Sequence, residues 1–374
     1  MLIREHVPMD STLIAYIDFK SPYAYLAIEP TRRLGRELGI TIDWRPFVLD
    51  IPSYLGSAKL DKSGGVAEAS RSEAQWSGVK YAYYDCRRYA NLYGMTIRGT
   101  VKIWDTDLAA AGMLWAKAQG EKILHRYIDG IYVPFWRREL DVESVDTIEQ
   151  VLVNAGAQLA GFKTFAGGEG RQRNREAQEA AFDQGIFGVP TYVIGDDKYF
   201  GREHLPRIRW QLAGAHGPAP DIEYELQPDS VVEKTSAKHL DVVIGLDDPE
   251  TVLTIPRVLG MAEDLGLTVN WLALPGRKTA LWDDANDQSR GARHRRYRRD
   301  NRDLDRNRYT EGLVAEDAAA QAVASALDQY GIILQEDKSG DGVAAAGYLS
   351  GSVFRLGDEV FVGRQHLPLI RARI

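Results

Sequence analysis

One short segment combines residue types and spacing that could do chemistry. Lys20-Ser21-Pro22-Tyr23-Ala24 follows an apolar stretch without breakers at residues 12–19, which predicts a buried strand, and precedes apolar residues at helical spacing over 25–38. Ser21 is therefore expected at a helix N-terminus, where backbone N–H groups and the helix dipole stabilise a negative charge such as a thiolate or carboxylate. The structural alternative is that Ser21 only caps the helix and Pro22 starts it.

A second candidate is the proline in Gly188-Val189-Pro190-Thr191, which directly precedes an apolar strand. Because proline cannot donate to a sheet ladder, it belongs at a strand start, and the small trans preference of X-Pro bonds allows a cis Val189–Pro190 bond. A cis bond would turn the Val189 N–H and C=O toward whatever occupies the nearby helix terminus. The alternative is an ordinary trans loop proline.

The elements that must position these residues follow a definite order. A strand, a helix closed by Gly39 and a second strand over 40–44 make a βαβ unit, which predicts a parallel sheet. A helical block follows, and then a β-hairpin over 188–200 and a last helix over 205–213. The candidate helices of the block are 78–93, 106–118, 121–136, 144–155 and 171–182. This order predicts an α/β, thioredoxin-like fold with a helical insertion.

The chain also repeats itself. Residues 38–44 recur as 265–271, an offset of 227, and residues 201–209 recur as 363–371, an offset of 162. The second copy is shorter by the difference, 65 residues, which are lost where the helical insert sits. We therefore expect a tandem duplication: a first domain over 1–215 with its insert at about 70–185, a Gly- and Pro-rich linker over 216–238, and a shortened, degenerate copy over 239–374.

The second copy lacks the residues that could do chemistry. Under the two offsets Ser21 corresponds to Asp248 and Pro190 to Ser352. An aspartate at the helix terminus would repel a thiolate. We therefore expect the second copy to be non-catalytic and to serve dimer-like packing or to close the cleft of the first.

Together, the βαβ start with Ser21, the helical insert, the run that ends in Val189-Pro190 and the turn over 200–204 resemble two families. These are the 2-hydroxychromene-2-carboxylate isomerases and the kappa-class glutathione transferases, in the DsbA-like branch of the thioredoxin superfamily. The resemblance covers residues 12–212 and implies that Ser21 and Ala24 replace the two cysteines of a C-P-x-C redox site. The single cysteine, Cys86, lies elsewhere, so dithiol–disulfide exchange is excluded.

The resemblance also implies glutathione as cofactor. Ser21 would donate a hydrogen bond to the glutathione sulfur, and with the helix terminus would favour the thiolate over a thiol whose ordinary pKa is ~8.5. The Val189 backbone, next to Pro190, would pair with the cysteinyl part as an added strand. The turn expected to hold the γ-glutamyl end comprises Gly201, Arg202, Glu203 and His204. The family commonly has Asn or Ser followed by Asp in this turn.

An acceptor pocket is implied in the same way. Its residues would be Tyr23, Lys80, Tyr84, Asp85 and Arg88. Asp85 and Arg88 are spaced i, i+3, so a surface ion pair is the structural alternative. The implied activity is a glutathione-dependent isomerisation of the 2-hydroxychromene-2-carboxylate type, in which the thiolate adds to an aromatic conjugated substrate and is expelled after bond rotation. A kappa-like glutathione S-transferase and a non-catalytic DsbA-like binding module are the alternatives.

Composition and charge limit the kinds of molecule that the protein is expected to bind. The chain has 374 residues, 44% hydrophobic and 26% charged, with a net charge of −7, which favours two soluble domains and disfavours a whole-protein nucleic-acid binder. Residues 290–309 contain nine arginines, interleaved with aspartates, and we interpret them as a solvated helix rather than a nucleic-acid patch. The seven histidines show no metal-binding spacing.

The sequence shows neither a recognisable signal peptide nor a membrane-spanning segment. The first residues lack the layout of a signal peptide, and apolar runs such as 108–116 are shorter than the ~20 residues needed to cross a bilayer. We expect a cytoplasmic protein that acts on a small aromatic or electrophilic molecule, without a membrane, nucleic-acid or metal partner. It would be a monomer with pseudo-dimeric lobes or a homodimer.

Overall fold

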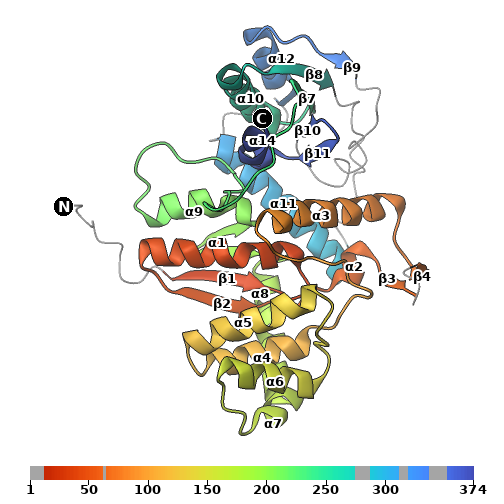
Figure 1. Ribbon diagram of the computed structural model, residues 1–374, viewed down its shortest axis with the longest axis vertical. Helices are drawn as coiled ribbons and strands as arrows, with labels where there is room; N and C mark the ends of the chain where they lie inside the picture. The colour runs from red at the N-terminus through yellow and green to blue at the C-terminus, as the bar shows by residue number, and fades with distance from the viewer. Residues whose placement is uncertain (1–11, 62–64, 274–286, 311–318, 337–351) are drawn as a thin grey trace, which may run out of the picture. The chain divides into compact units, whose positions relative to one another are not determined.

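The computed structural model describes residues 12–61, 65–273, 287–310, 319–336 and 352–374 (Figure 1). The chain divides into two compact units: Met1–Arg71 with Cys86–Pro220, and Ser72–Asp85 with Asp221–Ile374. This division differs from the expected boundaries because Ser72–Asp85, from the expected insert of the first domain, belongs to the second unit. The N-terminal residues 1–11, where a signal peptide would begin, lie outside the described residues.

The first unit is built on a four-stranded sheet in the order β2-β1-β5-β6. Strand β1 pairs parallel with β2, whereas β1–β5 and β5–β6 are antiparallel. Its strands are β1 (Leu13–Ile17), β2 (Ile42–Pro46), β5 (Thr191–Ile194) and β6 (Asp197–Phe200), with a separate hairpin of β3 (Ala58–Leu60) and β4 (Val66–Ala69). The βαβ start and the hairpin expected from sequence are confirmed, and with them the thioredoxin-like fold.

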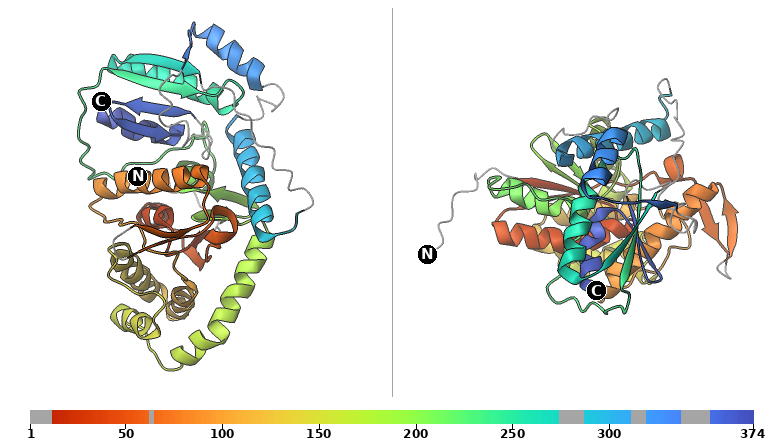
Figure 2. Two further views of the ribbon diagram at one scale, coloured as in Figure 1. Left: turned by 90° about the vertical axis from the view of Figure 1, so that its right-hand side faces the viewer. Right: turned by 90° about the horizontal axis from the view of Figure 1, so that it is seen from above.

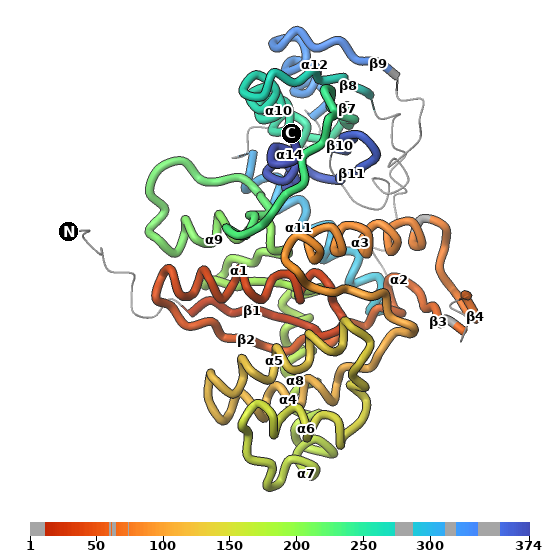
Figure 3. Tube along the Cα trace, viewed as in Figure 1, coloured from red at the N-terminus to blue at the C-terminus, as the bar shows by residue number. Residues whose placement is uncertain are grey.

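Helices cover both faces of this sheet. The helices from residue 22 to residue 212 are α1 (Pro22–Leu38), α2 (Ile51–Leu55), α3 (Glu73–Leu92), α4 (Asp107–Lys117), α5 (Glu121–Trp136), α6 (Val145–Ala155), α7 (Phe162–Gly167), α8 (Glu169–Asp183), the 3₁₀ turn η1 (Arg202–His204) and α9 (Leu205–Leu212). Helix α3 is divided between the units at Asp85 and Cys86. Figure 3 shows α1 on one side of β1 and β2 and the insert helices α4 and α5 on the other, and Figure 2 shows α8, the last helix of the insert, as a long helix beside the others.

Helix α1 begins and ends where its sequence dictates. Ser21 has an extended backbone and its Oγ accepts the Ala24 N–H at 3.2 Å, while Pro22 occupies the first turn, where no backbone donor is needed. Gly39 ends the helix in the left-handed conformation, with φ of 66°. The helix therefore places Ser21 at its N-terminus, at the carboxyl end of β1.

The second unit repeats this sheet. Its elements are β7 (His239–Ile244), α10 (Glu250–Leu265), β8 (Thr268–Ala273), α11 (Arg290–Thr310), α12 (Ala319–Gln329), β9 (Gln335–Glu336), β10 (Val353–Leu356), β11 (Glu359–Val362), η3 (Arg364–His366) and α14 (Leu367–Arg373). The strand order is β11-β10-β7-β8-β9, which is the order of the first sheet extended by β9. The arginine-rich segment is helix α11, as expected, but most of its side chains are half-buried rather than solvated.

The strand registers show that the two sheets are copies. In the first unit Ala15 pairs with Trp44 and with Tyr192. The offsets of 227 and 162 carry these pairs onto Val242 with Trp271 and Val242 with Phe354, which the structure contains. A register slip of one residue would turn every side chain to the other face, so agreement on both sides of the central strand confirms the tandem duplication.

The core of the second unit includes a residue from α3. The buried side chains of Tyr81, Val243, Val353 and Val362 pack together. The Tyr81 hydroxyl accepts the Val362 N–H at 2.7 Å. A stretch of sequence that precedes the linker by more than a hundred residues therefore completes the core of the second copy.

Candidate active site

Ser21 is buried at the N-terminus of α1, with 5% of its surface exposed. Its Oγ accepts from Ala24 N, and its hydroxyl donates to the Val189 carbonyl oxygen at 3.5 Å, the outer limit of a hydrogen bond. The Val189–Pro190 bond is cis, as the sequence suggested. The structure thus brings together Ser21 and the Val189-Pro190 pair, 168 residues apart in sequence.

A buried polar network that the sequence did not reveal lies directly beneath Ser21. Asp18 is 3% exposed, and its carboxylate accepts from Thr106 Oγ1 at 2.6 Å and from Leu49 N at 2.7 Å. The backbone carbonyl of Asp18 accepts from Ser21 N at 3.0 Å and from the Tyr132 hydroxyl at 3.0 Å. Asp18 therefore joins the end of β1 to the segment after β2, to the start of α4 and to α5.

Lys20 completes this network. Its side chain is 6% exposed, and its Nζ lies 3.7 Å from Asp18 Oδ2 and donates to the Trp104 carbonyl at 3.2 Å. A buried ammonium group is tolerated because a carboxylate and a carbonyl oxygen replace part of its hydration. The Lys20–Asp18 pair thus carries no net charge, and the helix terminus is the remaining positive end beside Ser21.

An aromatic cluster packs beside the same network. The Tyr25 and Tyr132 rings stack with centroids 5.0 Å apart, and Phe19 lies 4.9 Å from Tyr132. Burial raises the pKa of Tyr132 well above its ordinary value, so its hydroxyl stays protonated and donates to Asp18 O. Tyr23, which the sequence placed in an acceptor pocket, is half-buried in the first turn of α1.

The turn after β6 has a backbone that requires glycine. Gly201 has φ of 115°, and its N–H donates to the Pro190 carbonyl at 2.9 Å. The Glu203 carboxylate folds back into the space that a Cβ on Gly201 would occupy. Arg202 and His204 are 4% and 3% exposed, and the Arg202 guanidinium lies over the Tyr89 ring at 4.5 Å. Glu203 is therefore the more exposed side chain of this turn.

The residues expected on the first insert helix are divided between the units. Lys80, Tyr84 and Asp85 belong to the second unit and Arg88 to the first. Asp85 is buried, and its Oδ1 lies 3.7 Å from Nε2 of His366 in the second copy. Lys80 and Tyr84 are exposed. Tertiary packing of α3 causes this division, and the i, i+3 spacing alone did not indicate it.

In the second copy an ionic network occupies the corresponding positions. Glu250 corresponds to Tyr23. Its carboxylate accepts a hydrogen bond from Arg364 Nη1 at 2.7 Å, and Arg364 also donates two hydrogen bonds of 2.8 Å to Asp221. Burial raises the pKa of Glu250 even though Arg364 opposes that shift. Asp248 Oδ1 accepts from Glu250 N at 3.1 Å and lies 3.8 Å from Arg306 Nη2. Carboxylates thus stand where the first copy has an uncharged hydroxyl.

Among the described residues, no group of His, Cys, Asp or Glu side chains could hold a metal ion. In the same part of the chain, none of the helices is both long and apolar enough to span a bilayer. Cys86 is fully buried in α3.

The DSBA-like thioredoxin domain matches residues 12–213, and the chain therefore belongs to the DSBA-like thioredoxin family. The 2-hydroxychromene-2-carboxylate isomerase of Sphingobium xenophagum is 26% identical over 201 residues, which are 53% of this chain and 95% of that protein. The isomerase of the same name from Pseudomonas putida is 24% identical over 193 residues, 51% of this chain and 88% of the relative. These findings confirm the resemblance seen in the sequence.

A solved structure of a selenomethionine 2-hydroxychromene-2-carboxylate isomerase is also similar. It is 22% identical, covers 55% of this chain and 100% of its own, and has a TM-score of 0.42.

Proposed function

We propose that the first unit is a glutathione-dependent isomerase of the 2-hydroxychromene-2-carboxylate type, with Ser21 stabilising the glutathione thiolate. The observation that carries the proposal is the placement of the Ser21 hydroxyl at the N-terminus of α1, beside the Val189 carbonyl. The isomerase names of the curated relatives support the reaction class.

The chemistry of Ser21 suits this role. Because its bond to Val189 O is as long as 3.5 Å, its proton can be redirected to a sulfur anion at little cost. The N-terminus of α1 favours a negative charge there, and the Lys20 ammonium balances the charge of the neighbouring Asp18 carboxylate. When bound, glutathione would supply the nucleophilic sulfur that this chain's single buried cysteine does not.

The surrounding residues fit the rest of glutathione. Val189 lies two residues before β5 begins, where an extended cysteinyl segment could pair with its backbone. The Glu203 carboxylate, held over Gly201, is an acceptor for the γ-glutamyl ammonium. The half-buried Tyr23 ring follows Ser21 on α1 and would contact an aromatic substrate, for which Lys80, Tyr84, Asp85 and Arg88 were the other sequence candidates.

The test compares two serine caps. Ser144 caps α6 as Ser21 caps α1, accepting the Thr147 N–H at 3.3 Å. Ser21→Ala and Ser144→Ala should each cost about 1 kcal/mol of stability. Only Ser21→Ala should abolish the ultraviolet absorbance of bound thiolate and lower isomerase turnover by about 100-fold. Equal activity in both variants, or no calorimetric binding of millimolar glutathione to the wild-type chain, would contradict the proposal.

The same assay separates the alternatives. An isomerase returns glutathione unchanged, so its concentration stays constant while the substrate is converted. A transferase consumes one glutathione for each product molecule. A binding module would take up glutathione without converting any substrate.

A further inference from the structure

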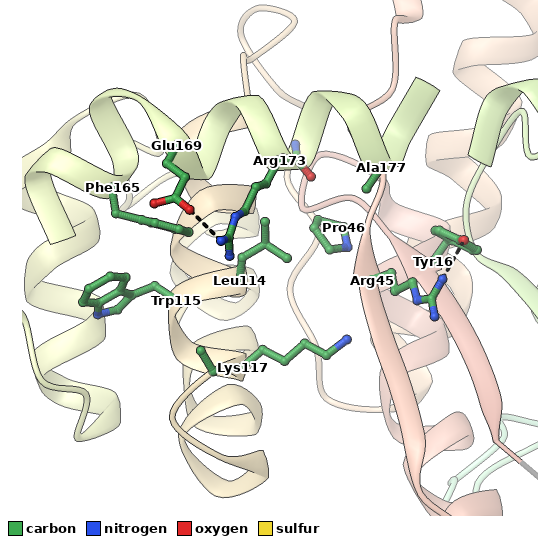
Figure 4. Close-up of a pocket in the computed structure, with 12 residues that line it drawn as sticks. Tyr16, Arg45, Pro46, Leu114, Trp115, Lys117, Phe165, Glu169, Arg173 and Ala177 are labelled. Carbon is green, nitrogen blue, oxygen red and sulfur yellow. Dashed lines mark hydrogen bonds and ion pairs between the residues drawn. The ribbon is translucent and has the colours of Figure 1, made fainter. Parts of the chain in front are cut away.

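A cavity in the first unit is lined by none of the residues assigned to the Ser21 site. It has a volume of about 570 Å³ and lies between β1, β2 and the helices α4, α7 and α8 (Figure 4). Cavities of this size accept small organic ligands. Its two ends differ in chemistry: Figure 4 shows Trp115 and Phe165 at one end and Arg45 with Tyr16 at the other.

The first end is aromatic. The Trp115 and Phe165 rings lie 5.1 Å apart, tilted by 49°. The Trp115 Nε1 donates to the Gln158 carbonyl at 2.7 Å, so the polar edge of the indole is already satisfied. The neighbouring Glu169 and Arg173 pair with each other at 2.6 Å and add no net charge. This end therefore offers aromatic surface to a flat, apolar ligand.

The second end carries excess positive charge. Lys117 and Arg45 share one carboxylate, that of Asp43, and Lys117 Nζ also donates to the Trp44 carbonyl at 2.8 Å. Burial alone would raise the pKa of Asp43, but bonds and charge from these two cations outweigh it and lower the pKa. Two cations with one ionised carboxylate leave a net charge of about +1, held in fixed positions.

We propose that this cavity is a binding site for an aromatic monocarboxylate, with its ring against Trp115 and Phe165 and its carboxylate between Lys117 and Arg45. A single negative charge on the ligand balances the net positive charge of the second end. An aromatic ligand is preferred over a small inorganic anion because only the former also contacts Trp115 and Phe165. The site is separate from Ser21, and the proposal does not depend on glutathione binding or on turnover.

The experiment titrates the full chain by calorimetry with 2-naphthoate and, as uncharged control, 2-naphthalenemethanol. The wild-type protein should bind the acid at least about tenfold more tightly than the alcohol. Added salt should lower the affinity for the acid and leave the affinity for the alcohol unchanged. Lys117→Gln should lower the acid's affinity about tenfold, whereas Lys117→Arg retains it. Ser21→Ala, which leaves this cavity unchanged, should bind 2-naphthoate as the wild type does.

Several results would overturn the proposal. These are equal affinity for acid and alcohol, no binding of millimolar 2-naphthoate, or unchanged affinity in Lys117→Gln. Loss of binding in Ser21→Ala would assign the ligand to the Ser21 site instead. If Lys117→Gln does not fold, Arg45→Gln tests the same charge, and the salt dependence of the wild type decides independently.

Discussion

Thr106 Oγ1 donates a 2.6 Å hydrogen bond to Asp18 Oδ1, and both residues are buried. Thr106 directly precedes helix α4 of the insert, and Asp18 follows strand β1, three residues before Ser21. Together with the bond from the Tyr132 hydroxyl to the Asp18 carbonyl, this contact joins the inserted helices to the thioredoxin sheet next to the candidate catalytic serine. The position of Ser21 thus depends on a contact between Asp18 and a residue 88 positions further along the sequence.

Replacing Thr106 with Val tests this anchor. The substitution keeps the side-chain shape but leaves Asp18 Oδ1 with only the Lys20 N–H, at 3.3 Å. We expect a loss of about 1–3 kcal/mol in the free energy of unfolding, because a buried carboxylate loses its shortest bond. Urea denaturation measures it. Thr164→Val, at an exposed position of α7, is the control, and an equal effect in both variants would exclude a special role for the anchor.

Glu203→Gln tests recognition of the γ-glutamyl end. The second copy already carries Gln365 at the corresponding position, folded over Gly363 as Glu203 is over Gly201. The variant should therefore fold normally and lose only the negative charge. We expect about a tenfold weaker affinity for glutathione in calorimetry, since a charge-assisted bond becomes a neutral one. Gln365→Glu should leave the affinity unchanged, and unaltered binding by Glu203→Gln would assign the ammonium to another group.

Asp305 makes the stability of the second unit depend on pH. Burial raises its pKa to about 7, despite bonds from Arg308 and Asn301. The folded state therefore binds this proton more tightly than the unfolded state. The stabilisation of the folded state by protonated Asp305 is full below about pH 4 and is lost as pH rises to about 7. Asp305→Asn should flatten this decline. Thermal unfolding of both proteins across that range measures it, and parallel curves would show that Asp305 does not titrate there.

Tyr81→Phe tests whether α3 is part of the second unit's core. The variant keeps the ring among Val243, Val353 and Val362 but leaves the Val362 N–H without the acceptor it has at 2.7 Å. We expect a loss of about 1–3 kcal/mol of unfolding free energy. Hydrogen exchange should speed up at Val362 and its neighbours on β11. Exchange that is unchanged there would refute the role assigned to this hydroxyl.

Local sequence patterns predicted the elements well wherever burial enforces a period. The apolar run of β1, the capping Ser21 and the closing Gly39 all acted as the pattern indicated. The sequence repeat predicted the second sheet from the first. The short hairpin of β3 and β4 escaped notice because the described side chains of β4 are all exposed and show no apolar alternation.

The site was harder to predict than the fold. Ser21 and Pro190 belong to recognisable motifs, whereas Asp18, Thr106 and Tyr132 meet only through tertiary contacts. A charged residue at the end of an otherwise apolar strand was the one signal for Asp18. No local signal indicated that α3 would be divided between the units after Asp85.

That division has an evolutionary consequence. A duplicated gene usually yields two domains that recombination can separate again at the linker. Here a cut after Pro220 would strip the second copy of Tyr81, which lies in the interval encoded by the first. Recombination at the linker would therefore deliver a second copy that lacks this part of its buried core.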